Sequence, residues 1–455
     1  MWVRVLIGIV GVGWAQDTIL IDRRRYLTQY DLTRKREKWV ITGYPLAGYD
    51  ALRGIGAGVA ALIAYNGHRS DPTFAFTPYK YHLFTQVGGF LRGSRYLRLF
   101  YDMPWIHNRP YRVTLRLSYR EENQGQFWGI GERTFDRAFP EPSLASYEAR
   151  LSIAMLDSSG TWQTSIAQHQ FYIKQWQGWL IGERIAYRGL MRLMWGLRWT
   201  GEYLASLKGE TYFLPTPAGN KVSALQRPTL IDSAVQGLSP VVKHTSILLN
   251  RWQHRWMLGG AVVWDTRDFE LNPNRGWLIE LNHESRIPDF ATHKSTLSIR
   301  NYHLWYKSPS EAVQISGAVH LLMTATYGSA LPLTDLQIHT RWADGRLPNL
   351  LSGPSTLRAF RENRFLAPYA YLFQYEVRSR LGELRIWRQH FTGGPVIFAD
   401  IAAARDKLGS PSPKYLASGM GTGVRLLWNM STVVRADAAY GREGWQLHFT
   451  TTHPF

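Results

Sequence analysis

The chain of 455 residues contains no cysteine, which excludes disulfide bonds and metal sites built on thiolates. Long apolar runs are also missing. The longest, from Val5 to Ala15, is about half of the ~20 residues that a membrane-spanning helix needs, so a helical membrane protein is excluded. Disorder is excluded by the aromatic content of 19 Trp, 24 Tyr and 19 Phe, because so much apolar surface has to be buried.

The formal net charge is +19, from 53 basic and 34 acidic side chains, yet the sequence does not indicate a nucleic-acid partner. Nucleic-acid binding would require a basic face together with a recognisable reading module. Arginine is instead scattered singly through apolar segments, without a basic tail, a zinc finger or an aromatic ribonucleoprotein motif. We therefore expect no nucleic-acid partner.

Residues 1–15 are predicted to be a secretory signal peptide. Arg4 supplies a positive charge, residues 5–14 form an apolar stretch, and Gly13 and Ala15 are the small residues that a signal peptidase reads. A buried N-terminal strand is the alternative. No cysteine follows the apolar stretch, so a lipoprotein anchor is excluded, and we expect a bacterial protein of the periplasm or the outer membrane.

Strict alternation of apolar and polar side chains predicts strands with one apolar and one strongly polar face. In residues 111–120 the apolar row reads Tyr, Val, Leu, Leu, Tyr, and the polar row reads Arg, Thr, Arg, Ser, Arg. Residues 191–200 and 369–378 alternate in the same way. These segments run for about ten residues and carry aromatic side chains near their ends, which is the pattern of strands that cross a bilayer. A large soluble β protein is the alternative.

The fold class that follows is all-β, a transmembrane antiparallel β-barrel of sixteen strands, because backbone groups in lipid must all be paired internally. We assign residues 16–50 to a short periplasmic N-terminal segment and residues 51–455 to the barrel. Short turns at Gly93, 308–310 and 429–430 are expected at the periplasmic end, since long loops face outward in such barrels.

One part of this topology is inconsistent. Between residues 110 and 205 the expected strands are 110–121, 146–157, 161–176 and 184–204. They place the stretch 122–145 at the periplasmic end, although it is too long for a periplasmic turn. Either the number of strands is wrong here, or the stretch is an ordered plug.

The last predicted strand ends on phenylalanine. Leu447, Phe449 and Phe455 lie on its apolar row, and such a strand resembles the sorting signal that bacterial outer-membrane barrels present to their assembly machinery. His453 and Pro454 depart from that signal, and Pro is tolerated only where its missing N–H faces no partner, as at an edge. The implied partners are the barrel assembly machinery during biogenesis and the lipid and lipopolysaccharide of the outer membrane.

Two further stretches carry charged residues at strand ends and on long connections. The first is Asp265-Thr266-Arg267-Asp268, followed by Pro273 and Gly276, and its simplest interpretation is a good hairpin. The second is Gly-Pro-Ser-Thr-Leu-Arg-Ala-Phe at 353–360, on the long connection 327–365.

Together these stretches resemble the BamA/TamA-type assembly and two-partner-secretion superfamily of outer-membrane proteins, also called bacterial surface antigen barrels. Residues 265–276 resemble the periplasmic hairpin of the family, and residues 353–360 resemble the Val-Arg-Gly-Phe tip of its long sixth loop. Residues 398–400, Phe-Ala-Asp, resemble its Phe-x-Asp pattern on the wall.

The resemblance implies that the long loop folds into the lumen, where Arg358, beside Phe360 at the loop tip, is held by Glu376 and Asp400. A guanidinium between two carboxylates makes directional, charge-assisted bonds. Three unrelated lumen charges are the alternative. Ala359 and also Ala402 stand where the family has Gly, and Ala would be strained at a position that needs a positive φ.

For function, the resemblance implies insertion of other barrels, or passage of polypeptide or lipid, in the outer membrane. It covers residues 250–455 best and implies a member without POTRA domains, which leaves a separate periplasmic accessory protein as a candidate partner. A passive or anion-selective pore, lined by arginines such as Arg112 and Arg198, is one alternative. A surface binding or adhesion barrel that acts through the loop 207–250 is another.

Catalytic chemistry is not expected. The sequence has no Gly-x-Ser-x-Gly elbow for a serine nucleophile and no His-Glu-x-x-His helix or paired His at metal spacing. The glycines of 419–423 fall in a strand pattern and indicate close packing in the wall rather than a phosphate site. We therefore predict no catalytic residues, no metal and no cofactor.

Overall fold

The computed structural model describes residues 21–50, 54–91, 93–135, 170–206, 211–213, 221–223, 229–237, 244–337, 340–343, 351–386, 389–429, 432–451 and 453–455. Strands dominate these ranges, so the predicted all-β antiparallel class is confirmed. The predicted signal peptide lies outside them. None of the helices in these ranges has the length and the apolar character needed to cross a membrane.

Seventeen strands form one antiparallel sheet. They are β1 (Trp39–Asp50), β2 (Gly54–Tyr65), β3 (Tyr81–Phe90), β4 (Arg95–Met103), β5 (Tyr111–Gln126), β6 (Gln170–Ala186), β7 (Met191–Ser206), β11 (Arg251–Asp265), β12 (Gly276–Ile287), β13 (His293–Lys307), β14 (Gln314–Tyr327), β16 (Tyr369–Arg380), β17 (Gly382–Ile386), β18 (Gln389–Arg405), β19 (Leu416–Trp428), β20 (Thr432–Gly441) and β21 (Gly444–Thr451).

Short elements lie in the connections between these strands. They are η1 (Arg23–Arg25), α2 (Gln29–Arg34), η2 (Ile106–Asn108), η3 (Glu132–Phe135), η4 (Tyr187–Gly189), α5 (Leu230–Val235), α6 (Leu333–Gln337), η5 (Pro413–Tyr415), the pair β8 (Thr211–Phe213) and β9 (Lys221–Ser223), and the pair β10 (Thr245–Ser246) and β15 (Leu331–Pro332).

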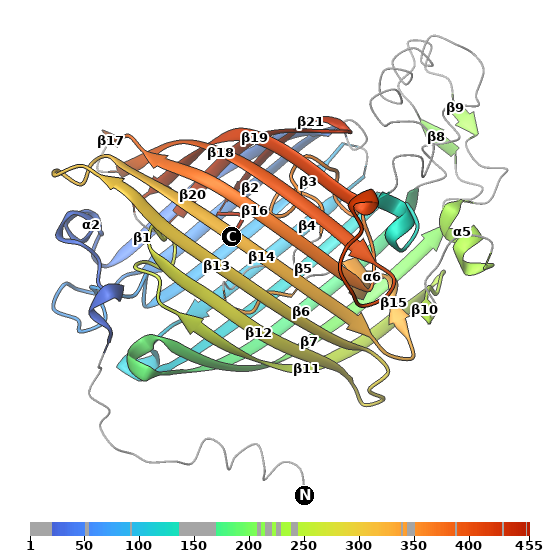
Figure 1. The fold of residues 1–455 in the computed structure, drawn as a ribbon, viewed down its shortest axis with the longest axis horizontal. Helices are drawn as coiled ribbons and strands as arrows, with labels where there is room; N and C mark the ends of the chain where they lie inside the picture. Colours follow the sequence, from blue (N-terminus) through green and yellow to red (C-terminus); the bar gives the residue numbers. More distant parts are fainter. Residues whose placement is uncertain are drawn as a thin grey trace, which may run out of the picture.

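The sheet curls around an interior. Each strand pairs with the next along the chain, and β16 and β17 pair in line with the same strand, β18. Figure 1 shows the yellow and orange strands in front and the blue and cyan strands behind them. The described residues include no pairing between β1 and β21, so a closed barrel of sixteen strands stays a prediction.

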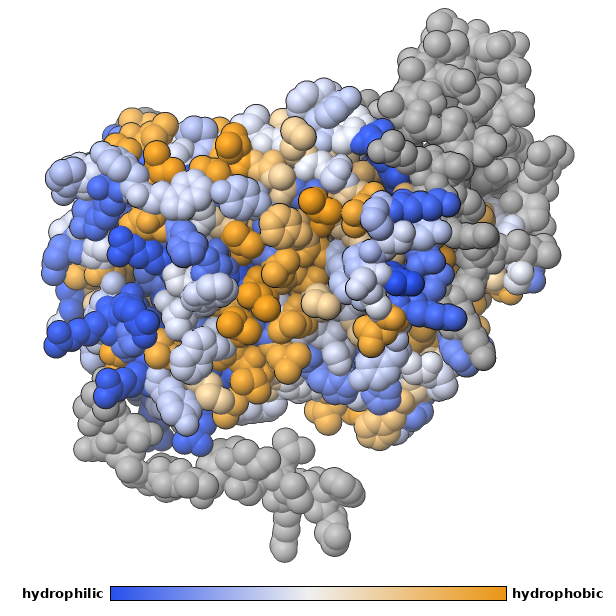
Figure 2. Space-filling view, viewed as in Figure 1, coloured by the Kyte–Doolittle hydropathy of each residue, from blue (hydrophilic) through white to orange (hydrophobic). Residues whose placement is uncertain are grey.

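The two faces of the wall differ as the period-two pattern requires. In β12 the side chains of Glu280, Asn282 and Glu284 are buried, whereas Leu281 between them is 58% exposed on the outside. Because strand side chains alternate, the polar row faces the interior and the apolar row faces outward. Figure 2 shows the result as an orange band across the middle of the visible face, between more hydrophilic areas at either end.

The two ends of the sheet carry different connections. The hairpin end, on the left in Figure 1, carries the turn 187–190 and the connections 266–275 and 308–313. The loop end, on the right, is where the long connections 127–169, 207–250 and 328–368 leave the sheet.

Two sequence-based expectations about the strands are wrong. The sequence places residues 39–50 in the N-terminal segment, but they form β1, whose full length pairs with β2. Gly43, Pro45 and Gly48 obscure its alternation. Between 122 and 205, β5 pairs directly with β6, so the expected strand 146–157 has no place between them in this sheet and lies outside the described residues.

These two errors offset each other along the chain. The extra first strand places the turn at Gly93 at the loop end instead of the expected periplasmic end. One strand fewer between residues 110 and 205 then restores the alternation, so that 308–310 and the connection 266–275 share the hairpin end. The inconsistent stretch after residue 122 accordingly begins at the loop end.

The N-terminal segment, defined here as residues 21–38, packs across the hairpin end. Arg34 forms an ion pair with Glu383 of β17 at 2.6 Å, and Asp31 forms one with Arg380 of β16 at 3.1 Å. Lys35 is buried and donates to the carbonyl oxygens of Phe74 and Thr77, both at 2.5 Å. Burial lowers the pKa of Lys35 to about 7.

Leu281→Arg tests the outward apolar face. Placing a charge where lipid is expected should lower the free energy of unfolding by about 2–4 kcal/mol, measured by urea titration in vesicles. Phe290→Arg is the control, because Phe290 is 58% exposed in the turn 288–292 beyond the strand. Equal effects of the two changes would contradict a lipid-facing wall.

Lys35→Met tests the packing of the N-terminal segment through its pH dependence. The pKa is about 7 in the packed state against an ordinary 10.5, so between these values the released segment binds a proton that the packed segment does not. Packing should therefore strengthen as the pH rises from 7 to 10. The unfolding temperature of the wild type should rise relative to that of Lys35→Met over this window, whereas parallel curves would contradict the packing.

Candidate functional site

Described residues of the connection 328–368 lie against the inner face of the wall, which the chain reaches from the loop end. Residues 351–367 bury Leu357, Phe360 and Phe365 in a cluster with side chains of β16 and β18. The Phe360 ring meets the Phe365 ring edge-on at 5.1 Å. An apolar cluster inside a polar wall gives this stretch a fixed position, since removing it would expose these side chains to water.

Arg358 lies at the centre of this stretch and is fully buried. Its Nε and Nη2 donate to the two carboxylate oxygens of Asp400 on β18 at 2.8 and 2.7 Å, and its backbone N–H donates to Asp400 at 3.1 Å. Its Nη1 donates to Glu376 on β16 at 2.5 Å. The guanidinium plane also covers the Phe398 ring at 3.5 Å. The structure thus brings together Arg358, Asp400 and Glu376.

The pair of carboxylates belongs to a larger network, which we name the Arg358 cluster. Glu376 also binds Arg378 at 2.7 Å and Arg425 at 2.8 Å. Arg425 in turn binds Asp437 on β20 at 2.5 Å. The cluster comprises Arg358, Glu376, Arg378, Asp400, Arg425, Arg435 and Asp437. Burial of so many charges is tolerable only because each carboxylate has at least one guanidinium partner.

Glycines in the wall make room for the loop tip. A Cβ added at Gly419 would lie 2.1 Å from the Cβ of Ala359, and one added at Gly441 would lie 2.8 Å from it. The glycines of 419–423 are therefore packing positions. Ala359 has no positive φ, unlike Gly353 (φ 127°), so Ala in place of the family's Gly is not strained here.

The Arg358 cluster reaches the last strand of the sheet. Nε2 of His448 on β21 lies 2.8 Å from the carbonyl oxygen of Arg358. Gln374 on β16 donates to Asp400 at 3.2 Å and to the carbonyl oxygen of Thr356 at 2.9 Å. The loop tip is thus bonded to β16, β18 and β21, which lie on either side of β19 and β20.

The predicted hairpin residues lie at the hairpin end. Asp265 accepts two bonds from Arg267, both at 2.9 Å, and lies 3.5 Å from Arg25 of the N-terminal segment. Asp268 accepts backbone N–H bonds from three residues of the turn, and burial raises its pKa to about 6. Gly276 has φ 104°, and a Cβ there would meet the carbonyl oxygen of Thr266 at 2.2 Å. Pro273 is buried in the turn.

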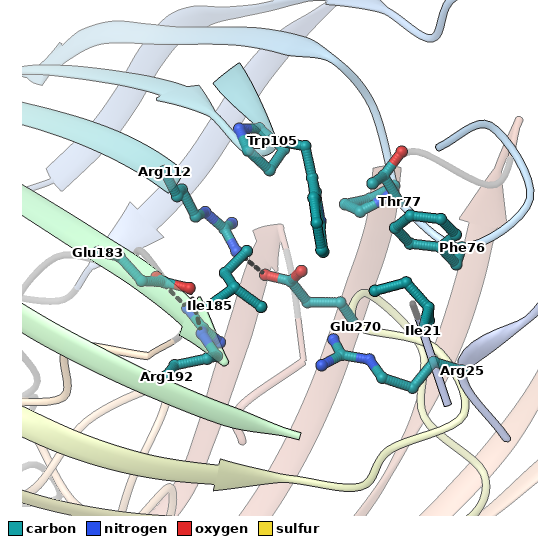
Figure 3. A pocket seen from close by; sticks show the side chains of 12 residues that line it. Ile21, Arg25, Phe76, Thr77, Trp105, Arg112, Glu183, Ile185, Arg192 and Glu270 are labelled. Atoms are coloured by element: carbon teal, nitrogen blue, oxygen red, sulfur yellow. Dashed lines mark hydrogen bonds and ion pairs between the residues drawn. The ribbon is translucent and has the colours of Figure 1, made fainter. Parts of the chain in front are cut away.

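A small pocket separates this hairpin from the N-terminal segment (Figure 3). In the close-up, Arg112 points to Glu270 and Arg192 points to Glu183, and the ion pairs measure 2.8 and 2.6 Å. The lining residues are Ile21, Arg25, Phe76, Thr77, Pro78, Pro104, Trp105, Arg112, Glu183, Ile185, Arg192 and Glu270. Its charged side chains already hold partners from the chain itself.

The predicted C-terminal row differs from the structure at its end. Leu447 and Phe449 are 69% and 70% exposed on the outer face, but Phe455 is buried inside the wall. Its ring packs with Tyr302 and Ala318, and Arg378 donates to its carbonyl oxygen at 3.2 Å. Pro454 cannot donate to a neighbouring strand, so the chain leaves the sheet before it and turns inward.

Sequence reasoning missed several members of this site. Arg425 and Arg435 are recognisable as inward residues from the alternation, but nothing local indicates that they share carboxylates with Arg358. Arg378 follows Glu376 on the same polar row, which is the signal that could have included it. Among the residues that the structure describes, no group of three or more His, Asp and Glu is arranged to hold a metal ion.

Two family models match the chain. The model described as the Omp85 superfamily domain matches residues 86–444, and a domain of unknown function (DUF5982) matches residues 17–80. No curated protein matches the chain.

Several solved structures are similar in fold at low sequence identity. They include BamA from Haemophilus ducreyi lacking POTRA domains 1–3 (9% identity, TM-score 0.43), CdiB from Acinetobacter baumannii (11%, 0.43) and CdiB from Escherichia coli (10%, 0.47). The alignments cover 92%, 93% and 92% of this chain but 70%, 66% and 62% of those chains. The chain thus spans about two thirds of the length of these structures.

Gly419→Ala tests whether the wall glycines seat the loop tip. The new Cβ would collide with Ala359, so we expect a loss of about 1–3 kcal/mol of stability and a displaced loop tip. Because the chain has no cysteine, Ser352→Cys can report the position of the loop through its rate of maleimide labelling. Adding Ala359→Gly to Gly419→Ala removes the Cβ with which the new side chain collides. Maleimide labelling at position 352 should then become slow again. Gly178→Ala, where a Cβ has room, is the control.

Proposed function

The chain belongs to the Omp85 superfamily, and from this membership we propose that it inserts polypeptides into the outer membrane or moves them across it. Members of the family are outer-membrane proteins that assemble or translocate other proteins and are not enzymes. The chain is accordingly a non-enzymatic protein of the bacterial outer membrane. Its client and its partners belong to the proposal.

We place the hairpin end in the periplasm and the loop end outside the cell. Bacterial outer-membrane barrels have short periplasmic turns and longer extracellular loops, and the three longest connections leave the sheet at the loop end. In this orientation the N-terminal segment and the hairpin 266–275 face the compartment from which clients arrive.

In the proposed mechanism the Arg358 cluster is a lumen lock. The observation that carries this is the contact of His448 on β21 with the carbonyl oxygen of Arg358 at 2.8 Å, because it couples the loop tip to the last strand. A client strand that pairs with the edge of β21 would act on the same strand that contacts the lock. Movement of the loop and opening of the sheet edge are then one event.

A passive anion-selective pore is less well supported. Such a pore needs arginines whose charge is free to attract anions. Arg112 instead binds Asp102 at 2.6 Å, and Arg198 binds Glu284 at 2.8 Å and Asp335 at 3.1 Å. Residues 340–343 and 351–367 of the connection 328–368 also lie in the interior.

Arg358→Ala tests the lock. It leaves Asp400 buried without its guanidinium, so we expect a loss of about 3–5 kcal/mol of stability and slower insertion of an unfolded barrel client into proteoliposomes. Asp400→Asn combined with Arg358→Ala should be less harmful than the sum of the single changes, with a coupling energy of about 0.5–3 kcal/mol.

Arg36→Ala, which changes an exposed arginine of the N-terminal segment, is the control for lost charge. Only protein that shows the compact electrophoretic mobility of a folded barrel enters the comparison. Client insertion at the wild-type rate by folded Arg358→Ala would contradict the lock, and strong anion-selective conductance of the wild type would favour the pore.

A further inference from the structure

A second part of the connection 328–368 binds the opposite side of the interior. Residues 340–343 lie against β5, β6, β7 and β12, whereas the Arg358 cluster involves β16, β18, β19 and β20. We name this inner surface, made by β5, β6, β7, β11 and β12, the β12 wall. Trp342 and Ala343 are both buried against it.

The β12 wall holds these residues mainly by their peptide groups. Glu280 accepts the backbone N–H of Trp342 at 2.5 Å with one oxygen and that of Ala343 at 3.1 Å with the other. Asn282 donates to the carbonyl oxygen of Thr340 at 3.0 Å. One strand therefore recognises both the donors and an acceptor of a short peptide.

Arginines from neighbouring strands complete the recognition. Arg116 on β5 donates to the carbonyl oxygen of Trp342 at 3.1 Å, and Arg192 on β7 donates to that of Ala343 at 3.0 Å. Both arginines are about 98% buried or more. The N–H and C=O groups of two consecutive residues thus all bind side chains of the wall, and every residue except proline offers the same two groups.

A single side-chain pocket accompanies these bonds. The Trp342 ring lies 6.1 Å from that of Trp179 on β6, among Ile181, Met194 and other apolar residues of the wall. Its Nε1–H donates to Glu284 at 3.1 Å. A buried aromatic anchor of this kind supplies much of the binding energy in a recognition site.

We propose that the β12 wall is a binding site for an unfolded polypeptide segment with an aromatic side chain, and that residues 340–343 occupy it until a client displaces them. The inference rests on the proposed function and deepens it by naming the surface that receives the client. A client peptide offers the same N–H and C=O groups as residues 340–343, so it can form the same hydrogen bonds with the wall. Displacement therefore does not leave the buried Glu280 or Arg116 without a partner.

The test measures binding of a labelled peptide to the whole folded protein in nanodiscs. The probe has the sequence of residues 338–345, Ile-His-Thr-Arg-Trp-Ala-Asp-Gly, and its fluorescence anisotropy reports binding. In the wild type, residues 340–343 should leave the β12 wall unoccupied in less than about a tenth of the molecules, which weakens the apparent affinity for the peptide about tenfold or more. Trp342→Ala should release these residues and so bind the peptide at least about tenfold more tightly than the wild type. Trp305→Ala, which removes an exposed tryptophan of the outer face, is the matched control.

Ala343→Pro is a second variant, in case Trp342→Ala fails to fold. It removes the backbone N–H that donates to Glu280. It therefore weakens binding of the chain's own residues 340–343 to the β12 wall but not binding of the added peptide. In either background, Glu280→Leu or replacement of the peptide's Trp by Ala should weaken binding at least about tenfold. Binding no tighter than in Trp305→Ala, or unaffected by Glu280→Leu, would overturn the inference.

The outcome is separable from that of the proposed function. If the wild type inserts a barrel client but Trp342→Ala gains no affinity for the peptide, the inference alone fails. If no client insertion or translocation occurs in any condition, the proposed function fails, whatever the peptide does.

Discussion

The pairing of buried arginines with buried carboxylates is the constraint on which the interior depends. A charge taken out of water without a partner costs several kcal/mol, and the polar rows of the strands bring many charges inward. The connection 328–368 supplies part of the missing partners, namely Arg358 for Asp400 and Asp335 for Arg198. Loop and wall therefore stabilise each other, and neither is electrostatically complete alone.

This complementarity gives the two halves of the connection different partners. Residues 351–367 meet the strands near the end of the chain and bind them chiefly through side chains, with an apolar cluster around Phe360. Residues 340–343 meet β5, β7 and β12 and bind them mainly through peptide groups. Side-chain ion pairs require one particular sequence, whereas main-chain bonds accept many. Residues 351–367 are thus suited to holding a fixed position, and residues 340–343 are suited to being exchanged.

The sequence predicts the wall well because period two is a local signal. Rows such as those of β5 and β16 reveal both faces of a strand within ten residues. β1 escapes this signal because glycine and proline interrupt its alternation. Between residues 110 and 205 the sequence predicts four strands where the sheet has three, because the apolar runs there resemble an additional strand. The contact of Arg358 with Asp400 joins residues 42 positions apart, and only the family resemblance suggested it. The binding of residues 340–343 to Glu280 has no local signal, because nearly every residue carries the same peptide N–H and C=O groups whatever its side chain.

The inward turn of residues 453–455 constrains the order of events during biogenesis. The site for the Phe455 ring is built by Tyr302 and Ala318, so it exists only after β13 and β14 have formed. A ring enclosed there is hidden from any other protein. If the assembly machinery reads this phenylalanine as an address, it must do so beforehand, and burial of the ring then ends that interaction. The Phe455 ring would in this way be accessible to another protein before the wall forms and enclosed once β13 and β14 are in place.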